Sequence, residues 1–299
     1  MIDAPIKAML QYYGGKRSMA TKIVDALGFH RSYFEPFCGG ISIIFSKPPA
    51  AMETLNDMHG DVINLACVIA NDAACANLHE RLCRTLFVQS IFEEATSVLA
   101  SNGLPTVDRV LGVEPIHIDR AYWYFIQSWM GRGGVVGCDR DNQFAVRYTP
   151  GGGHGGTRFR SAVDSLPAWH LRLRHCTITR QDGIKLIDKL DDVPGVAIYC
   201  DPPYEKDSRG SSSRYLFDFN MNDHERMANA LDRFINAKVV ISYYDFPALK
   251  DLYPTRKWTW QRHQVASALA NMNEESRQGG EGKAIELLIC NNPSGRLRK

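Results

Sequence analysis

Two hydrophobic periods alternate along this chain, and together they predict a mixed α/β protein. Short apolar runs that end at glycine, proline or acidic residues are typical of buried strands in a parallel sheet. We predict strands just before the glycines at 39 and 40, before Asp57, and over residues 176–179, 196–200 and 238–242. Two further stretches, 257–265 and 283–290, are predicted to pair antiparallel across the polar segment 270–282.

Between these runs, apolar residues recur every three to four positions, which is the period of an amphipathic helix. A helix is expected directly after the glycines at 39 and 40, as in many nucleotide-binding turns. The residues from 59 to about 111 form the longest helical section, and an aromatic helix is predicted at 119–130. The remaining predicted helices are residues 19–27, 168–174, 184–190, 217–237 and 246–253.

Composition adds few constraints to this pattern. The chain has 299 residues, 44% hydrophobic and 23% charged, which is ordinary for a soluble globular protein of one large domain or two modest ones. A net charge of +2 means that any contact with nucleic acid must come from local basic patches. The first residues lack the apolar core of a signal peptide, and no apolar run is long enough for a membrane span. We therefore expect a cytoplasmic protein that makes no membrane contact.

Cysteine and histidine spacing gives no metal signature. The eight cysteines include no CxxC pair, and the nine histidines include no HExxH arrangement. Free thiols in a reducing compartment and no metal site are the expectation.

The most specific signal is the tetrad Asp201, Pro202, Pro203 and Tyr204, directly after the apolar run 196–200. Average residue frequencies produce such a tetrad by chance in roughly one in a thousand chains of this length. In open α/β sheets, ligands bind at the carboxyl ends of the strands. Two consecutive prolines fix the backbone, so that the Asp201 carboxylate and the Pro202 carbonyl point rigidly into one cleft.

Two acceptors beside an aromatic ring suit the exocyclic amine of a planar heterocycle. The acceptors hold its two hydrogens, and the ring of Tyr204 stacks on the base. The alternative is a turn in which Asp201 caps a helix and Tyr204 is half buried.

Three other motifs precede or flank this tetrad. Residues 11–17 read QYYGGKR, where glycines allow close approach to a ligand and Lys16 is suited to a carboxylate or phosphate. Residues 35–40 read EPFCGG, followed by Asp57 at the tip of the next predicted strand, which is the arrangement that binds a ribose. Asp182 is a second acid at a strand tip, suited to an adenine amino group or to a helix N-cap. Each motif is also compatible with a purely structural turn.

Arginines are interleaved with glycines between residues 131 and 160. Glycine-rich backbone can follow a phosphate chain while arginines grip phosphates or read base edges. A flexible surface loop is the alternative. The candidate nucleic-acid contacts are Arg132, Arg140, Arg147, Arg158 and Arg160.

In this order, the motifs YYGGK, EPFCGG, LND, the helical insert and YCDPPY resemble the Dam-type (DPPY, alpha-group) DNA adenine-N6 methyltransferases of bacteria and phages. The resemblance covers nearly the whole chain. It implies a Rossmann-like, S-adenosylmethionine-dependent methyltransferase fold with a seven-stranded, doubly wound mixed sheet. Residues 1–58 and 165–299 would form the catalytic domain, and residues 59–164 an inserted, mainly helical target-recognition domain.

The resemblance also implies roles for individual residues. The catalytic tetrad would be Asp201, Pro202, Pro203 and Tyr204, which hold a flipped adenine. The family's FxGxG is replaced here by Phe37, Cys38, Gly39, Gly40 and Ile41, with the second glycine one position early. S-adenosylmethionine would be bound by Tyr13, Gly14, Lys16, Glu35, Pro36, Phe37, Gly39, Asp57, Asp182 and Asp201.

Double-stranded DNA is the expected partner, and the protein is expected to be a monomer or weak dimer. Methylation of RNA or of a protein amide is an alternative, as is a catalytically silent relative that binds nucleic acid. The recognition sequence, and a setting in restriction-modification, regulation or phage protection, stay open.

Overall fold

The computed structural model describes residues 4–101, 116–132, 136, 142–146, 154–204, 216–266 and 283–292. The chain divides into two compact units. The first comprises Met1–Arg17, Gly39–Pro49 and Asp57–Gln181, and the second comprises Ser18–Cys38, Ala50–Asn56 and Asp182–Lys299. The predicted domain boundaries at 58 and 165 stay predictions.

Seven strands form one mixed sheet, in the order β3-β2-β1-β4-β5-β7-β6. β1 pairs parallel with β2 and β4, β4 pairs parallel with β5, and β7 pairs antiparallel with both β5 and β6. The predicted α/β fold with a seven-stranded mixed sheet is therefore confirmed. The strands are β1 (Ser32–Glu35), β2 (Met52–Asn56), β3 (Thr177–Thr179), β4 (Val196–Cys200), β5 (Lys238–Tyr244), β6 (Trp258–Ala266) and β7 (Lys283–Asn291).

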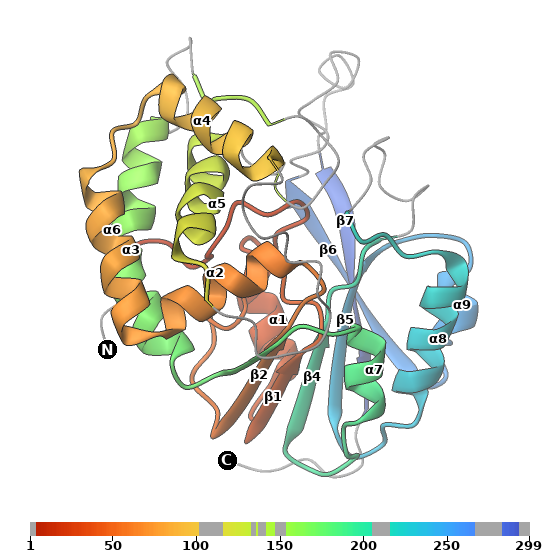
Figure 1. Cartoon of the computed structure of the whole chain (residues 1–299). Helices are drawn as coiled ribbons and strands as arrows, with labels where there is room; N and C mark the ends of the chain where they lie inside the picture. Colours follow the sequence, from red (N-terminus) through yellow and green to blue (C-terminus); the bar gives the residue numbers. More distant parts are fainter. Residues whose placement is uncertain are drawn as a thin grey trace, which may run out of the picture. The chain divides into compact units, whose positions relative to one another are not determined.

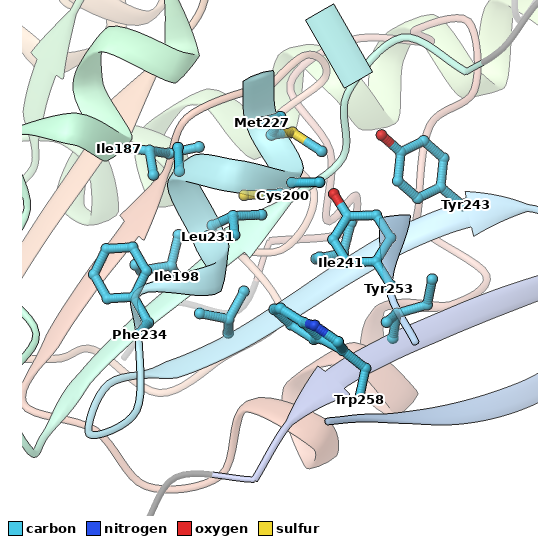
Figure 2. Packing of buried hydrophobic residues seen from close by; sticks show 14 of the residues in the cluster. Ile187, Ile198, Cys200, Met227, Leu231, Phe234, Ile241, Tyr243, Tyr253 and Trp258 are labelled. Carbon is cyan, nitrogen blue, oxygen red and sulfur yellow. The ribbon is translucent and has the colours of Figure 1, made fainter. Parts of the chain in front are cut away.

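In the second unit, helices cover both faces of the sheet, as the continuous apolar run of β4 requires. All five residues of β4 are buried. Val196, Ile198 and Cys200 face a core formed with α7, α8 and α9, and Figure 2 shows Met227 and Leu231 of α8 in this cluster. The helices of this unit are α1 (Ala20–Leu27), α7 (Gly183–Asp188), α8 (Met221–Asp232) and α9 (Leu249–Leu252).

The opposite face of the same strands carries buried polar groups. Strand side chains alternate between faces, so Ala197 and Tyr199 point away from the α7–α8 core. The Tyr199 hydroxyl lies 2.8 Å from the Ser242 hydroxyl, and the Tyr33 hydroxyl donates to Glu35 over 2.8 Å. These four buried side chains satisfy one another in pairs, as buried polar groups must.

The first unit is built around helices α2, α3, α4, α5 and α6 (Figure 1). Aromatic residues of α5 and α6 fill its interior, with the rings of Trp129 and Trp169 stacked 6.5 Å apart. Their indole N–H groups donate to the backbone carbonyls of Met9 and Ile6, at 3.0 and 2.7 Å. These bonds attach the N-terminal segment, which leads into the YYGGK motif, to the helices. The helices are α2 (Gly60–Ala70), α3 (Asp72–Arg84), α4 (Gln89–Ala100), α5 (Ile118–Met130) and α6 (Gly155–Leu173).

The helix predicted directly after the glycines at 39 and 40 does not form. Backbone N–H groups of Ser46 and Lys47 both bond to the Ile43 carbonyl, which gives a single turn before Pro48. Ile41 has a φ of 53°, in the left-handed region, and this conformation cannot start a right-handed helix. The prediction was therefore wrong at this point, because Ile41 and the two prolines interrupt the segment.

Among the described residues, no single helix is long and apolar enough to cross a membrane. Helices α2 and α3 reach that length and hydropathy only together, and the chain bends by 102° between them.

Candidate functional site

In the first unit, Gly39 and Asp57 lie together. The Gly39 N–H donates to Asp57 Oδ2 over 2.8 Å, and the His59 N–H donates to Oδ1 over 2.8 Å. Gly39 has a φ of 44°, so a glycine suits this turn. Burial raises the pKa of the Asp57 carboxyl, while the N–H donors of His59 and Gly39 act in the opposite direction. The predicted pairing of glycine turn and strand-tip acid is therefore present.

The side chain of Tyr12 lies over this glycine turn. A β-carbon on Gly39 would sit 3.1 Å from Tyr12 Cδ1, and one on Gly40 would sit 2.9 Å from Tyr12 Cβ. Residues 39 and 40 must therefore be small because Tyr12 packs against their backbone. Sequence reasoning did not single out Tyr12, although it belongs to the YYGGK motif.

In the same motif Tyr13 and Lys16 are buried, whereas Gly14 and Gly15 are exposed. Tyr13 donates its backbone N–H to the Val136 carbonyl over 2.8 Å, and the Lys16 ammonium donates to the Gly14 carbonyl over 2.8 Å. Gly14 has a φ of 73°, which suits the turn that brings Lys16 back onto it. Contacts of Tyr13, Gly14 and Lys16 with a cofactor stay predictions.

A buried charged cluster next to Asp57 was not foreseen. Arg120 of α5 forms a two-bond ion pair with Asp61 of α2, in which the Nη2–Oδ2 bond measures 2.9 Å. His59 lies beside this pair, and its ring is 5.6 Å from that of Tyr124. Burial lowers the pKa of His59, although the carboxylates of Asp61 and Asp57 favour its charged form. The helical period could not reveal the cluster because its members come from two helices and a loop.

In the second unit, the segment Glu35–Phe37 is fixed by buried contacts. Glu35 accepts the Tyr33 hydroxyl, and the Pro36 carbonyl accepts the Asn56 side-chain amide over 2.9 Å. The Asn56 carbonyl in turn accepts the Cys38 N–H at 2.9 Å. Asn56, the middle residue of LND, therefore holds the end of β1 to the end of β2.

Asp182 and Gly183 lie at the start of α7. The Asp182 carboxylate accepts the Ile184 N–H over 2.8 Å, so the helix-cap alternative is confirmed. Its second oxygen is 3.6 Å from Arg226 of α8. A β-carbon on Gly183 would sit 2.5 Å from Phe37 Cε1 and 2.8 Å from the Pro36 carbonyl oxygen. The structure therefore brings the predicted residues Pro36, Phe37 and Asp182 together, and Gly183 is a contact that the sequence did not single out.

The DPPY tetrad begins where the buried strand β4 ends. Asp201 and Pro203 are partly exposed, whereas Pro202 is buried. Tyr204 is 2% exposed, and its hydroxyl donates to Glu286 Oε1 over 3.2 Å. The ring of Tyr204 makes an edge contact with Tyr244, with centroids 4.8 Å apart. Tyr204 therefore anchors the end of the tetrad in the core of the second unit.

The candidate DNA-contacting arginines differ in their surroundings. Arg132 is exposed, and Arg158 donates to Gln11 Oε1 over 2.5 Å. Arg160 donates to three carbonyls at the end of α3, those of Leu82, Cys83 and Thr85, which is a structural capping role. Arg140 and Arg147 lie outside the described residues. DNA contacts by any of the five stay predictions.

Across the described part of the chain, no group of three or more His, Cys, Asp or Glu side chains is arranged to hold a metal ion. The seven described cysteines are free thiols, and burial raises the pKa of Cys200, next to Asp201.

Comparison with known proteins identifies the family. Searches of solved structures return the Escherichia coli protein yhhF, described as a methyltransferase, at 9% identity and a TM-score of 0.28, covering 94% of this chain and 82% of that one. They also return the rRNA methyltransferase aviRa from Streptomyces viridochromogenes, at 12% identity and a TM-score of 0.37, covering 91% and 83%. These likenesses are too low to carry an argument, and no curated protein matches. The family model of D12 class N6 adenine-specific DNA methyltransferases matches residues 12–267. The chain therefore belongs to the D12 class N6 adenine-specific DNA methyltransferase family.

Proposed function

We propose that this protein transfers a methyl group from S-adenosylmethionine to the exocyclic amino group of adenine in double-stranded DNA. Family membership supports the reaction class, and the observation that carries the proposal is Asp201 with Pro202 at the carboxyl end of the buried strand β4. Ligands bind at this end of the strands in open α/β sheets.

The adenine amino nitrogen is a weak nucleophile because its lone pair is delocalised into the ring. The Asp201 carboxylate and the Pro202 carbonyl each accept one N–H, which draws the nitrogen toward tetrahedral geometry and frees the lone pair. No strong base is needed beforehand, since methylation makes the nitrogen acidic. Asp201 or water then takes the proton.

The residues around Asp57 suit a nucleoside cofactor. Asp57 Oδ2 accepts the Gly39 N–H and Oδ1 accepts the His59 N–H, and carboxylate oxygens can accept further bonds, such as those from ribose hydroxyls. Gly39 and Gly40 allow the Tyr12 side chain to pack directly on the turn beside Asp57. In this proposal Asp57 binds the ribose, Asp182 faces the adenine ring, and Tyr13, Gly14, Lys16 and the Glu35–Phe37 segment complete the cofactor site. Bound S-adenosylmethionine supplies an electrophilic methyl group.

The target adenine must leave the DNA stack to reach Asp201. Flipping costs a few kcal/mol. Stacking on the Tyr204 ring returns about 1–3 kcal/mol once the base displaces the side chains that leave this residue 2% exposed in the unbound protein. Acceptor bonds and phosphate contacts by arginines such as Arg132 supply the remainder.

The test is sequencing that detects methyladenine in unmethylated DNA after incubation with the purified protein and S-adenosylmethionine. Asp201→Ala should lower the rate about 100-fold or more while the cofactor still binds. Asp191→Ala is the matched control, because Asp191 is an exposed carboxylate outside the site. Unmodified DNA with intact cofactor binding would favour an RNA or protein-amide substrate, and near wild-type turnover of Asp201→Ala would contradict the mechanism.

A further inference from the structure

Glu286 is a buried carboxylate in the middle of an apolar strand. It is 4% exposed on β7, where the two residues that follow it, Leu287 and Leu288, are fully buried. Its cross-strand neighbours are Tyr244 on β5 and His263 on β6. A carboxylate in such a place costs folding free energy, and an apolar residue would pack there more cheaply. A carboxylate at this position is therefore expected to have a polar partner.

The carboxylate accepts a hydrogen bond from the tyrosine of the DPPY tetrad. Tyr204 Oη lies 3.2 Å from Glu286 Oε1. The backbone of Tyr204 directly follows that of Pro203, and the pyrrolidine ring of Pro203 fixes the φ angle of this proline. The edge contact with Tyr244 adds a third constraint, with an interplanar angle of 74°. Backbone, ring edge and hydroxyl together determine the plane of the Tyr204 ring.

Glu286 also lies near the catalytic end of β4. After burial, the largest causes of the raised pKa of Tyr199 are the charges of Asp201 and Glu286. Both carboxylates therefore lie around the same phenol, whose hydroxyl is 2.8 Å from that of Ser242. Glu286 is close enough to the tetrad to act on its geometry.

We propose that Glu286 is a positioning residue, which holds the Tyr204 hydroxyl and so fixes the ring plane against which the target base stacks. The inference rests on the proposed function and deepens it. It assigns the late strand β7 a part in orienting the base, through a residue 82 positions after Tyr204. Glu286 itself touches neither base nor cofactor in this role.

The test is a double-mutant cycle on single-turnover methyl transfer to unmethylated plasmid DNA. Tyr204→Phe removes the hydroxyl and keeps the ring, Glu286→Leu removes the acceptor, and Glu286→Gln retains an acceptor oxygen of the same reach. We expect Tyr204→Phe and Glu286→Leu each to slow transfer about tenfold, which is the scale of one buried hydrogen bond, and the double variant to be no slower. Glu286→Gln should recover most of the rate, and Glu225→Gln, an exposed glutamate on α8, is the matched control.

Cofactor affinity separates positioning from a general structural effect. The dissociation constant for S-adenosylmethionine should stay within about twofold of wild type in every variant. The inference would be overturned if the rate losses of the two single variants multiplied in the double variant, or if Tyr204→Phe and Glu286→Leu had wild-type rates. Either outcome would leave the proposed DNA methylation intact. If Glu286→Leu does not fold, the pair Tyr204→Phe and Glu286→Gln carries the same comparison. A wild-type protein that binds the cofactor but leaves DNA unmodified would instead refute the proposed function, and this inference with it.

Discussion

The ring of Phe37 packs against the backbone of Gly183 so closely that a single methyl group does not fit between them. This contact joins the segment after β1 to the start of α7, two places where the family resemblance predicts cofactor contacts. Gly183 is therefore required by the shape of the site, in addition to following the helix-capping Asp182.

Gly183→Ala is expected to weaken cofactor binding. The new methyl group would lie 2.5 Å from the Phe37 ring and must displace it, and overpacking of this kind costs about 1–3 kcal/mol. Calorimetric titration with S-adenosylmethionine should show a dissociation constant raised about tenfold or more. Lys185→Ala, an exposed change in the same helix, is the control, and equal affinities of the two variants would refute the prediction.

At position 41, a glycine variant should be at least as stable as an alanine variant, although glycine is usually the less stabilising of the two. Ile41 is buried with a φ of 53°, a conformation that costs a residue with a β-carbon about 1–2 kcal/mol. Ile41→Ala and Ile41→Gly both lose the side chain, but the glycine variant is free of this strain. Urea unfolding should therefore find Ile41→Gly at least as stable as Ile41→Ala. If Ile41→Gly were instead less stable than Ile41→Ala by the roughly 0.5–1 kcal/mol that glycine usually costs, the strain at Ile41 would be absent.

His59 is expected to make the protein less stable in weak acid. Burial lowers its pKa below the ordinary 6.5, so the unfolded chain binds the proton more readily than the folded one. Stability from neutral His59 is complete above pH 6.5 and declines as the pH falls through 6.5 toward the lower folded pKa. Asp57 has the opposite effect on stability: because its pKa is raised, the folded protein binds the proton more readily than the unfolded chain at pH values above 3.8.

The measurement compares wild type with His59→Asn by urea unfolding between about pH 5 and 7.5. The free-energy difference between the two proteins should shift in favour of the variant as the pH falls. A difference that does not change with pH would mean that His59 does not titrate beside Asp57, Asp61 and Arg120.

Two arginines of the predicted DNA-binding set should behave differently. Arg160→Ala removes three bonds to the carbonyls that end α3, so it should lower the free energy of unfolding by about 1–2 kcal/mol. Arg132→Ala, at an exposed position, should leave stability unchanged and reduce the slope of log affinity for DNA against log salt by about 1. Filter binding at several salt concentrations checks the second effect. Identical salt slopes for Arg132→Ala and wild type would remove Arg132 from the DNA interface.

Local signals predicted much of this fold. The strand 196–200 matches β4 at both ends, and the helix 119–130 matches α5 to within one residue. Each has an uninterrupted hydrophobic pattern and clear flanking residues. The helix predicted over 217–237 is shorter, because Asn220 and Asp223 form a capping box that starts α8 at Met221. Side-chain capping therefore sets the start of α8, which the hydrophobic periodicity alone does not locate.

The candidate site was only partly predictable for a physical reason. Asp57, Asp182 and Asp201 follow short apolar strands, so their positions at strand ends could be read locally. Tyr12, Gly183 and Glu286 act through partners that are far away in sequence, and no periodicity links them to those partners. The family pattern also gave no warning that Ile41 adopts a conformation usually left to glycine.

The position of β7 between β5 and β6 has a consequence for how the second unit is assembled. β6 is paired with β7, which is made after it, and β5 also needs β7 to complete its second edge. During synthesis, the N-terminal strands and helices emerge long before residues 283–291 can insert between the two waiting edges. Until that insertion, exposed β5 and β6 edges offer unpaired backbone groups to other chains. Completion of the sheet is therefore a late, long-range event that depends on the last of its seven strands to be synthesised.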